Sequence, residues 1–258
     1  MATSYAITHL AYLPLRKEAD HKSENVSQLL CGELFEVLET KGSWQYIRAD
    51  FDGYEGWIDC AEVVLIPELE YNEIKKQRPV YSAGFFQQAG YESKRFTLGF
   101  GSRLPYWDGL GFRIGQETFV IKGEVYQANP LLPNEFIIEL ARKLLGIPYL
   151  WGGKSTFGID CSGLVQNVFK FVNINLPRDA WQQKEIGFDV PIEEAGTADL
   201  AFFVNEQGKT SHVGILVDNK HIIHASGKVR IDEFSEKGIF NVERKVHTHT
   251  LEVIKRVR

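Results

Sequence analysis

The chain has 258 residues and a formal net charge of −5, with 44% hydrophobic and 24% charged residues. These values are ordinary for a soluble globular protein of two or three domains, and the acidic balance argues against nucleic acid as a partner. The N-terminus lacks a basic region followed by an apolar core, and no stretch reaches the roughly 18 apolar residues of a membrane span. The sequence therefore predicts a cytoplasmic protein with no membrane partner. A periplasmic or secreted chain whose signal peptide had been removed would look the same.

The first half of the chain is rich in aromatic and β-branched residues and in glycine turns, and it shows no convincing amphipathic helix. Short strands are predicted at residues 28–30, 33–38, 44–48 and 55–58. A second set is predicted at residues 96–101, 105–107 and 119–125. The stretch 129–133, Asn-Pro-Leu-Leu-Pro, is typical of a linker.

The first set of strands resembles a bacterial SH3-like barrel, and its most recognisable element is Gly53-Tyr54-Glu55-Gly56-Trp57. We interpret the second set as a second, divergent SH3-like barrel. The expected domains are therefore residues 1–68 and 69–130, both all-β, followed by residues 131–258.

The three cysteines, Cys31, Cys60 and Cys161, are an odd number and do not make a disulfide framework. Cys31 and Cys60 lie in strand-like surroundings and are expected to be free core residues. The alternative is a bridge between them, which would place the protein in an oxidising compartment.

Cys161 differs from the other two because it opens a predicted helix. The apolar residues that follow it have helical spacing: Leu164, Val165, Val168, Phe169 and Val172. Asp160 is a natural N-cap, so Cys161 would lie in the first turn, where backbone N–H groups and the helix dipole lower a thiol pKa. The alternative is a small buried structural cysteine. Gly163 and the histidine motif downstream argue against it.

Two histidines follow on a predicted β-hairpin. His212 precedes the apolar run 213–217, and His224 ends a second strand that begins at residue 221. A two-residue loop would pair His212 with Ala225 and turn His224 to the opposite face, whereas a loop of residues 217–219 would pair the two histidines directly. A Cys161–His212–His224 triad therefore requires an odd loop or a bulge, with His224 orienting the base. The alternative for His224 is an ordinary half-buried histidine.

Four motifs in this order resemble the NlpC/p60 family of cell-wall cysteine peptidases over residues 131–258: GIPYLWGG (146–153), DCSG (160–163), ADLAFF (198–203) and SHVG (211–214). The resemblance implies an α+β fold, with a papain-like core, the nucleophile on a helix and both histidines on neighbouring strands. It also implies that Tyr149 helps to stabilise the oxyanion. Ala198 departs from the family pattern, which usually has Gly before Asp-Leu, and this affects a turn rather than the chemistry.

A chain in which SH3-like barrels precede such a domain resembles the enzymes that cut γ-D-glutamyl–diamino acid bonds in murein peptides during cell-wall recycling. In that subgroup the first barrel restricts the site to peptides with a free N-terminal L-Ala. The resemblance implies substrate-binding roles for Glu24, Tyr54, Trp151, Asp160, Ser162, Asp179 and Ala180.

For several of these residues a structural role is the alternative. The Asp179 carboxylate can pair with the substrate ammonium, or it can cap a helix at 180–183, and both can hold together. Ala180 stands where the family often has Ser, so it can offer only its backbone N–H. Glu24 and Tyr54 can instead be barrel surface and barrel packing.

Other signals do not point to a cofactor or a metal, and we expect neither. The run Gly153-Lys154-Ser155-Thr156 echoes a phosphate-binding loop, but Pro148 stands where the first Gly belongs. His247 and His249 alternate on a strand and, without a third ligand, are expected on a solvated face.

Two functions follow from the sequence. The first is a thiol endopeptidase that acts on small soluble murein peptides as a monomer. The second is a peptidoglycan-binding module, or a hydrolase that acts on intact cell wall. An amidase or acyltransferase on the same core is weaker, because it has no evident use for Asp179 and the barrels. No position distinguishes diaminopimelate from lysine in the third peptide residue.

Overall fold

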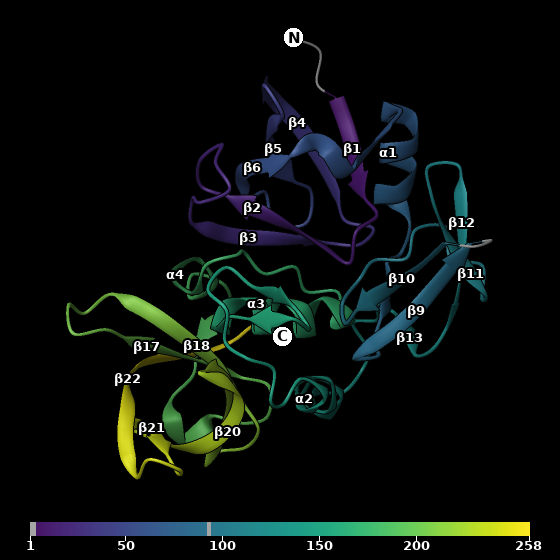
Figure 1. Ribbon diagram of the computed structural model, residues 1–258. Helices are drawn as coiled ribbons and strands as arrows, with labels where there is room; N and C mark the ends of the chain where they lie inside the picture. The colour runs from purple at the N-terminus through teal and green to yellow at the C-terminus, as the bar shows by residue number, and fades with distance from the viewer. Residues whose placement is uncertain (1–3, 92–93) are drawn as a thin grey trace. The chain divides into compact units, whose positions relative to one another are not determined.

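The computed structural model describes residues 4–91 and 94–258 (Figure 1). Its contacts divide the chain into two compact units. The first contains the residues up to Asn129 together with Trp151–Phe157, and the second contains Pro130–Leu150 and Gly158–Arg258. Within the described residues, no helix combines the length and the apolar character that a membrane span needs.

The first unit begins with a seven-stranded antiparallel sheet in the order β3-β2-β6-β5-β4-β1-β7. Its strands are β1 (Ser4–Thr8), β2 (Tyr12–Arg16), β3 (Asn25–Leu30), β4 (Leu34–Lys41), β5 (Trp44–Ala49), β6 (Glu55–Asp59) and β7 (Val63–Ile66), with a 3₁₀ turn at Cys60–Glu62. The four strands expected between residues 28 and 58 are confirmed. Alternate residues of these strands, such as Leu13, Leu15 and Phe35, face one core.

Gly56 shows why the Gly-Tyr-Glu-Gly-Trp element suits this sheet. A Cβ at Gly56 would lie 2.8 Å from Leu15 Cγ and 2.9 Å from the backbone oxygen of Arg16. Only a residue without a side chain allows β2 and β6 to come this close.

Between Glu68 and Gln127 the described residues of the first unit form a helix and six strands: α1 (Glu68–Lys76), β8 (Val80–Ser82), β9 (Phe86–Tyr91), β10 (Lys94–Gly99), β11 (Gly111–Ile114), β12 (Glu117–Lys122) and β13 (Val125–Gln127). These strands form a four-stranded sheet, β10-β9-β12-β11, and a separate ribbon of β13 and β8. A second SH3-like barrel is therefore not confirmed.

Two further expectations for this region were wrong. Helix α1 escaped the sequence pattern because only Tyr71 and Ile74 are buried and the remaining residues are mostly charged. Residues 105–107 form no strand, since Tyr106 has a φ of 56°, which extended backbone does not allow. Cys31 and Cys60 are free thiols, as expected, but only Cys31 is buried.

The second unit is a closed antiparallel barrel with helices against it. Its strands are β15 (Gly158–Ile159), β16 (Phe188–Asp189), β17 (Leu200–Val204), β18 (Thr210–Leu216), β19 (His221–Ser226), β20 (Lys228–Ser235), β21 (Gly238–Asn241) and β22 (Val246–Arg256); the two-residue β14 (Lys154–Ser155) lies in the segment assigned to the first unit. The sheet order is β16-β22-β17-β18-β19-β20-β21, and β21 also pairs with β22, which closes the barrel.

The helices of this unit are α2 (Asn134–Lys143), α3 (Cys161–Phe169) and α4 (Ala180–Gln183), with 3₁₀ turns at Lys170–Val172 and Ile192–Glu194. Every residue of α3 is buried, and the helix packs against β18 and β19. The second unit therefore has the expected α+β architecture.

Candidate active site

Helix α3 begins where the sequence predicts. The carboxylate of Asp160 accepts a hydrogen bond from the Gly163 N–H at 2.8 Å, which is the N-cap geometry, and Cys161 is the first helical residue. The β-strands that α3 covers carry the two histidines, so the fold gathers the three expected catalytic side chains in one unit.

The hairpin of β18 and β19 places His212 and His224 on one face, as the triad requires. Its turn is odd-numbered, residues 218–220, because Val217 N–H donates to the His221 oxygen. The odd-numbered turn is confirmed, but it lies one residue later than 217–219, so His224 lies opposite Gly214 rather than His212. A shift of two keeps the face, and His212 Nε2 lies 2.9 Å from His224 Nδ1.

Gly214 makes room for this arrangement. A Cβ at this position would lie 3.0 Å from the His224 Cβ and 2.6 Å from Ile222 Cδ1. Glycine in the Ser-His-Val-Gly motif therefore has a steric reason, because a larger residue would displace the second histidine.

Asp232 and Arg230, which the sequence analysis missed, continue the chain of polar contacts. His224 Nε2 lies 3.1 Å from Asp232 Oδ2, and Arg230 donates to Asp232 through Nε at 2.6 Å and Nη2 at 2.9 Å. Asp232 is 1% exposed. The sequence did contain a signal for these two residues. On the strand after His224, the charged residues Arg230 and Asp232 alternate with the apolar Ile231, so both charged side chains lie on one face.

His249 corrects a second expectation. It is half-buried, and its ring stacks on that of His212 with 4.2 Å between centroids and 25° between planes. His247 is exposed, as expected. Strand β22 pairs with β17 and closes the barrel, which brings His249 to His212. No local sequence pattern indicates this pairing of distant strands.

Burial keeps the histidines neutral. It lowers the pKa of His212 well below the ordinary value, and the neighbouring His224 and His249 lower it further. Burial also lowers the pKa of His224, although Asp232 acts in the opposite direction. The pKa of His249 falls to about 4, mainly through burial.

The thiol of Cys161 differs from the expectation of a lowered pKa. Cys161 is 6% exposed, and burial raises its pKa to about 12, with a further rise from the Asp160 carboxylate. The backbone N–H group of Ser162, at the helix start, and that of Val213, on β18, both favour the thiolate, but burial outweighs them. The resting site therefore contains a thiol and a neutral imidazole.

Tyr149 lies on the segment before α3. Its N–H donates to the Gly227 oxygen at 3.0 Å, and it forms a β-bridge with Ile159. Burial raises the pKa of its phenol, and the nearby acidic groups of Cys161 and Asp160 raise it further. The hydroxyl therefore keeps its proton and can donate a hydrogen bond.

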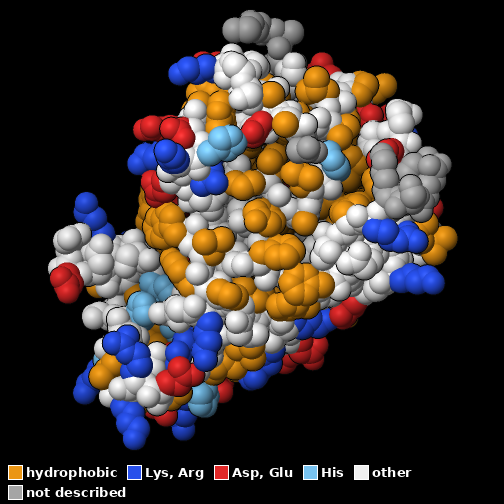
Figure 2. Space-filling view, viewed as in Figure 1, with side chains coloured by type: hydrophobic (Ala, Val, Ile, Leu, Met, Phe, Trp, Pro, Cys, Tyr) orange, Lys and Arg blue, Asp and Glu red, His pale blue; other side chains and the backbone are white. Residues whose placement is uncertain are grey.

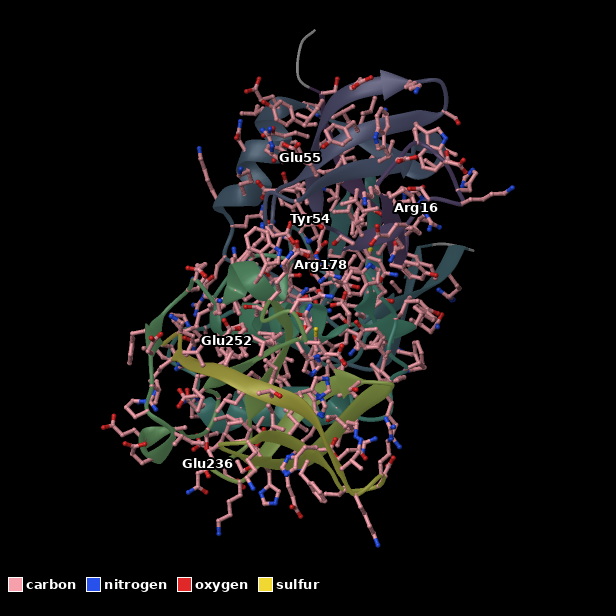
Figure 3. All side chains as sticks on the ribbon, turned by 90° about the vertical axis from the view of Figure 1, so that its left-hand side faces the viewer. Arg16, Tyr54, Glu55, Arg178, Glu236 and Glu252 are labelled. Atoms are coloured by element: carbon pink, nitrogen blue, oxygen red, sulfur yellow. The ribbon has the colours of Figure 1, made fainter. Side chains whose placement is uncertain are left out.

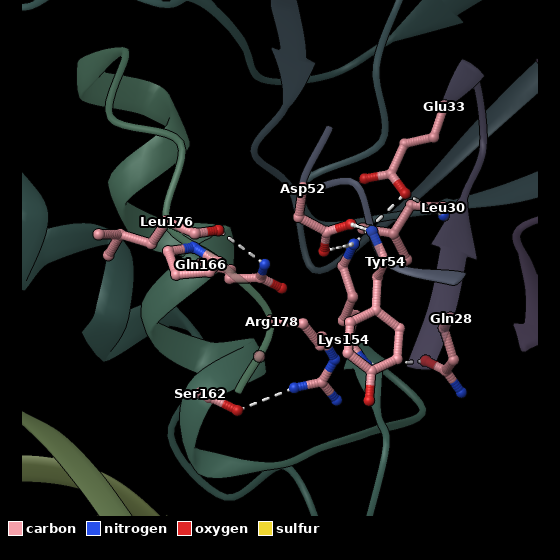
Figure 4. A network of polar contacts seen from close by, with 12 residues as sticks. Gln28, Leu30, Glu33, Asp52, Tyr54, Lys154, Ser162, Gln166, Leu176 and Arg178 are labelled. Carbon is pink, nitrogen blue, oxygen red and sulfur yellow. Dashed lines mark hydrogen bonds and ion pairs between the residues drawn. The ribbon is translucent and has the colours of Figure 1, made fainter. Parts of the chain in front are cut away.

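Arg178 is a further residue that the sequence analysis missed. It is 1% exposed, and its guanidinium binds both oxygens of Asp160, at 3.0 and 2.5 Å. It also donates to Ser162 Oγ at 2.8 Å (Figure 4). Asp160 and Ser162, which the resemblance assigns to substrate binding, thus also form a buried network at the start of α3.

Asp179 and Ala180 stand at the start of α4. Gln182 Oε1 accepts a hydrogen bond from Asp179 N–H at 3.0 Å, so the helix-capping alternative holds for this residue. Asp179 is half-buried and Ala180 is 9% exposed.

The remaining three predicted substrate residues lie together in the first unit. Glu24 and Tyr54 line one pocket of about 350 Å³, near Glu55, which Figure 3 labels beside Tyr54. Trp151 Nε1 donates to Glu24 Oε1 at 2.8 Å, and Asn25 Nδ2 donates to the Trp151 oxygen. Glu24 and Trp151, which are far apart in the sequence, are therefore in direct contact beside this pocket.

Lys154 attaches the segment Trp151–Phe157 to that sheet. Its ammonium lies 3.4 Å from Glu33 Oε2 and 4.0 Å from Asp52 Oδ2, and its N–H donates to Gln28 Oε1 (Figure 4). Lys154 is 1% exposed. Its charge is therefore paired within the first unit.

Known proteins share these features. Residues 146–247 match the NlpC/P60 family, and residues 15–63 match the bacterial dipeptidyl-peptidase Sh3 domain. The chain is 30% identical to a γ-D-glutamyl-L-lysine dipeptidyl-peptidase of Bacillus subtilis over 223 residues, which cover 77% of this chain and 71% of the relative. It is 29% identical to the peptidoglycan endopeptidase RipB of Mycobacterium tuberculosis over 62% of this chain and 75% of RipB.

Among solved structures, an NlpC/P60 family protein from Bacillus cereus has the same fold, with a TM-score of 0.82 and 21% identity over 98% of this chain and 99% of that one. The first unit accordingly contains an SH3-like domain, and the cysteine at a helix start with two histidines on neighbouring strands lies in the region that matches the peptidase family. The chain therefore belongs to the NlpC/P60 family of cysteine peptidases.

Proposed function

We propose that this protein cleaves the γ-D-glutamyl–diamino acid bond of cell-wall peptides that carry a free N-terminal L-Ala, in the recycling of peptidoglycan. The observation that carries the proposal is the polar chain from His212 through His224 to Asp232, on strands that helix α3 covers. The names of the Bacillus subtilis and Mycobacterium tuberculosis relatives support a cell-wall peptide as substrate.

The contacts fix the protonation of the catalytic base. A carboxylate can only accept, so His224 Nε2 donates to Asp232 and, in a neutral ring, His224 Nδ1 accepts. His212 Nε2 must then carry the proton of the shared hydrogen bond. His212 Nδ1 is left with a lone pair, and this atom is the base that we assign to Cys161.

In the first step His212 Nδ1 takes the thiol proton as sulfur attacks the γ-carbonyl carbon. The Tyr149 hydroxyl and the Cys161 N–H, which lies in the first turn of α3, donate to the developing oxyanion. His212 then gives the proton to the leaving amine, so the C–N bond breaks as the thioester remains.

In the second step water attacks the thioester carbonyl and His212 accepts a water proton. The C–S bond breaks, L-Ala-γ-D-Glu leaves as the free acid, and the proton returns to the thiolate. The network of Arg178, Asp160 and Ser162 holds the start of α3 in place while the oxyanion forms.

The acyl side of the substrate is assigned to the residues that the sequence predicts. In the second unit, Asp179 would pair with the L-Ala ammonium. In the first unit, Glu24 would bind substrate, and Trp151, which donates to Glu24, would orient that carboxylate. We also propose that residues 69–130 are a second, divergent SH3-like barrel.

The test compares L-Ala-γ-D-Glu-diamino acid peptides with and without an N-acetyl group, and both with intact sacculi, with products identified by mass. The free amine should be preferred roughly 30-fold or more, because acetylation leaves the half-buried Asp179 carboxylate without its partner in the bound peptide. Asp179→Ala should narrow that preference. Equal cleavage of both peptides, or release of peptides from sacculi alone, would instead indicate an enzyme that acts on intact wall.

A further inference from the structure

A pocket of about 590 Å³ lies within the first unit, where the end of α1 meets β8, β13 and residues 104–107. A volume of this size, lined by apolar and aromatic side chains with a few polar groups, is typical of sites that bind small molecules. None of the residues assigned to catalysis or to the peptide substrate lines it. Its walls include the aromatic Tyr106 and Trp107, the polar Gln77, Arg78 and Gln127, and the apolar Val80.

Tyr106 has a strained backbone that several contacts hold in place. Its φ of 56° lies in the left-handed region, which a bulky aromatic residue rarely adopts. Its N–H donates to Gln77 Oε1 at 3.0 Å, and its hydroxyl donates to Glu73 Oε2 at 3.2 Å. The guanidinium of Arg113 lies 4.0 Å from the centre of its ring. Strain that the surrounding contacts impose in this way is concentrated at ligand sites, so Tyr106 points to a binding role for the pocket.

The contact with Tyr106 also orients the side chain of Gln77. Because Oε1 accepts the Tyr106 N–H, the Nε2 group of the same amide is left to donate. Gln77 is half-buried, and within the described residues its Nε2 has no acceptor. The pocket therefore offers a fixed hydrogen-bond donor to a ligand.

Arg78 adds a cation to this pocket. Its Nε donates to the oxygen of Ala128, just after β13, at 2.6 Å, which tethers the guanidinium and leaves its two Nη groups available. Within the described residues Arg78 makes no ion pair, and no Asp or Glu is among those that line the pocket. By contrast, Lys and Arg side chains of the first unit lie next to Asp and Glu at the upper left of Figure 2. The free edge of Arg78 fits a carboxylate, which accepts two parallel hydrogen bonds from a guanidinium.

The aromatic and amide side chains indicate what kind of molecule carries that carboxylate. Tyr106 and Trp107 are half-buried and give the pocket flat, largely apolar surfaces. A sugar ring has apolar C–H faces that pack on such surfaces, and its hydroxyl groups can accept from Gln77 and exchange hydrogen bonds with Gln127. A purely apolar acid would cover the aromatic surfaces but would desolvate the Gln77 donor without giving it a partner, which is unfavourable.

We infer that this pocket binds a sugar that carries a carboxylate, with the ring against Tyr106 and Trp107 and the carboxylate on Arg78. The inference gives residues 69–130 a ligand-binding role. This role is separate from the proposed cleavage, since no catalytic residue lines the pocket.

Calorimetric titration of the full chain with two matched pairs of sugars tests the inference. The pairs are N-acetylmuramic acid with N-acetylglucosamine, and glucuronic acid with glucose; only the acid of each pair carries a carboxylate. At least one acid should bind about tenfold more tightly than its neutral partner, as expected for a charge-assisted contact. Arg78→Gln should remove that difference and leave the neutral sugar unchanged. The matched control Lys122→Gln, which removes an exposed charge from β12 of the same unit, should change neither.

Trp107→Leu tests the aromatic wall and should weaken the binding of acid and neutral sugar alike, with circular dichroism as a check on folding. Equal binding of acid and neutral sugars, absence of binding by all four, or a preference that Arg78→Gln leaves intact overturns the inference. Unchanged affinities in folded Trp107→Leu overturn the placement of the ring. Binding of N-acetyl-alanyl-alanine in place of the sugars would assign the carboxylate to a peptide and also overturn it. Cleavage enters none of these measurements, so their outcome is independent of the proposed function.

Discussion

At the scale of single residues, the site depends on side chains that are buried and paired. Asp232 is held by Arg230 and in turn holds His224, and its pKa falls to about 2 because these hydrogen bonds outweigh the effect of burial. Such a carboxylate remains charged across the physiological range. It can therefore define the tautomer of both His224 and His212.

Asp232→Asn should lower kcat by roughly 10²-fold or more, because an amide that donates to His224 reverses the tautomers and removes the lone pair from His212 Nδ1. The measurement is steady-state cleavage of the free-amine peptide, with circular dichroism as a check on folding. Glu243→Gln is the matched control, since Glu243 binds Arg230 without contacting His224. Near wild-type kcat for Asp232→Asn would remove Asp232 from the polar chain.

The pH dependence of the enzyme follows from the lowered histidine pKa values. His212 stays an unprotonated base well below pH 6.5, so kcat/KM should stay constant as the pH falls through 6.5 and should decrease only at more acidic pH. The thiol has a pKa of about 12, so its ionisation should not reduce kcat/KM up to pH 9. Because the unfolded histidines bind protons first, their contribution to stability is complete above pH 6.5 and is lost as the pH falls through the folded values. A pH–rate profile between pH 4 and 9 checks this, and an acid limb centred at 6.5 or above would contradict it.

At the scale of secondary structure, the turn before β17 contains an alanine, Ala198, at a position where the backbone conformation favours glycine. Ala198 has a φ of 72°, the left-handed conformation that favours glycine, and its N–H donates to the Leu216 oxygen at 2.8 Å. The family pattern has Gly here, so the departure noted in the sequence falls at a strained position.

Ala198→Gly should raise the free energy of unfolding by about 1 kcal/mol, because relief of the left-handed strain exceeds the entropy that glycine adds to the unfolded chain. Urea denaturation monitored by fluorescence measures the change. The turn lies outside the polar chain, so kcat should stay the same. A loss of stability would mean that the Ala198 methyl group contributes more by packing than the backbone loses by strain.

At the scale of the whole molecule, the chain passes from the second unit into the first and back again between Leu150 and Gly158. The buried ammonium of Lys154 stabilises the segment Trp151–Phe157 through its ion pairs with Glu33 and Asp52. Removal of one partner of a buried ion pair leaves a charge without compensation, which costs far more than the loss of a surface pair.

Lys154→Met should therefore lower the free energy of unfolding by about 3–5 kcal/mol. Lys17→Met is the matched control, because Lys17 pairs with Glu24 at 3.4 Å while its side chain is 65% exposed, and the expected loss is below about 1 kcal/mol. Thermal unfolding of the full chain compares the two. Equal effects would show that the buried pair contributes no more than the exposed one.

The sequence by itself determined the chemistry of this protein and the local frame that carries it. The Asp160 cap, the helix that opens at Cys161, the common face of His212 and His224 and the four strands of the SH3-like domain all follow from patterns within a few residues, where periodicity and capping act. Only the tertiary structure decided which distant residues complete the site. His249 reaches His212 because β22 closes the barrel, Arg178 reaches Asp160 across a helix and a loop, and burial raises the Cys161 pKa that the helix start alone would lower. Strand neighbours and burial are set by the packing of the whole unit, and no local pattern encodes them.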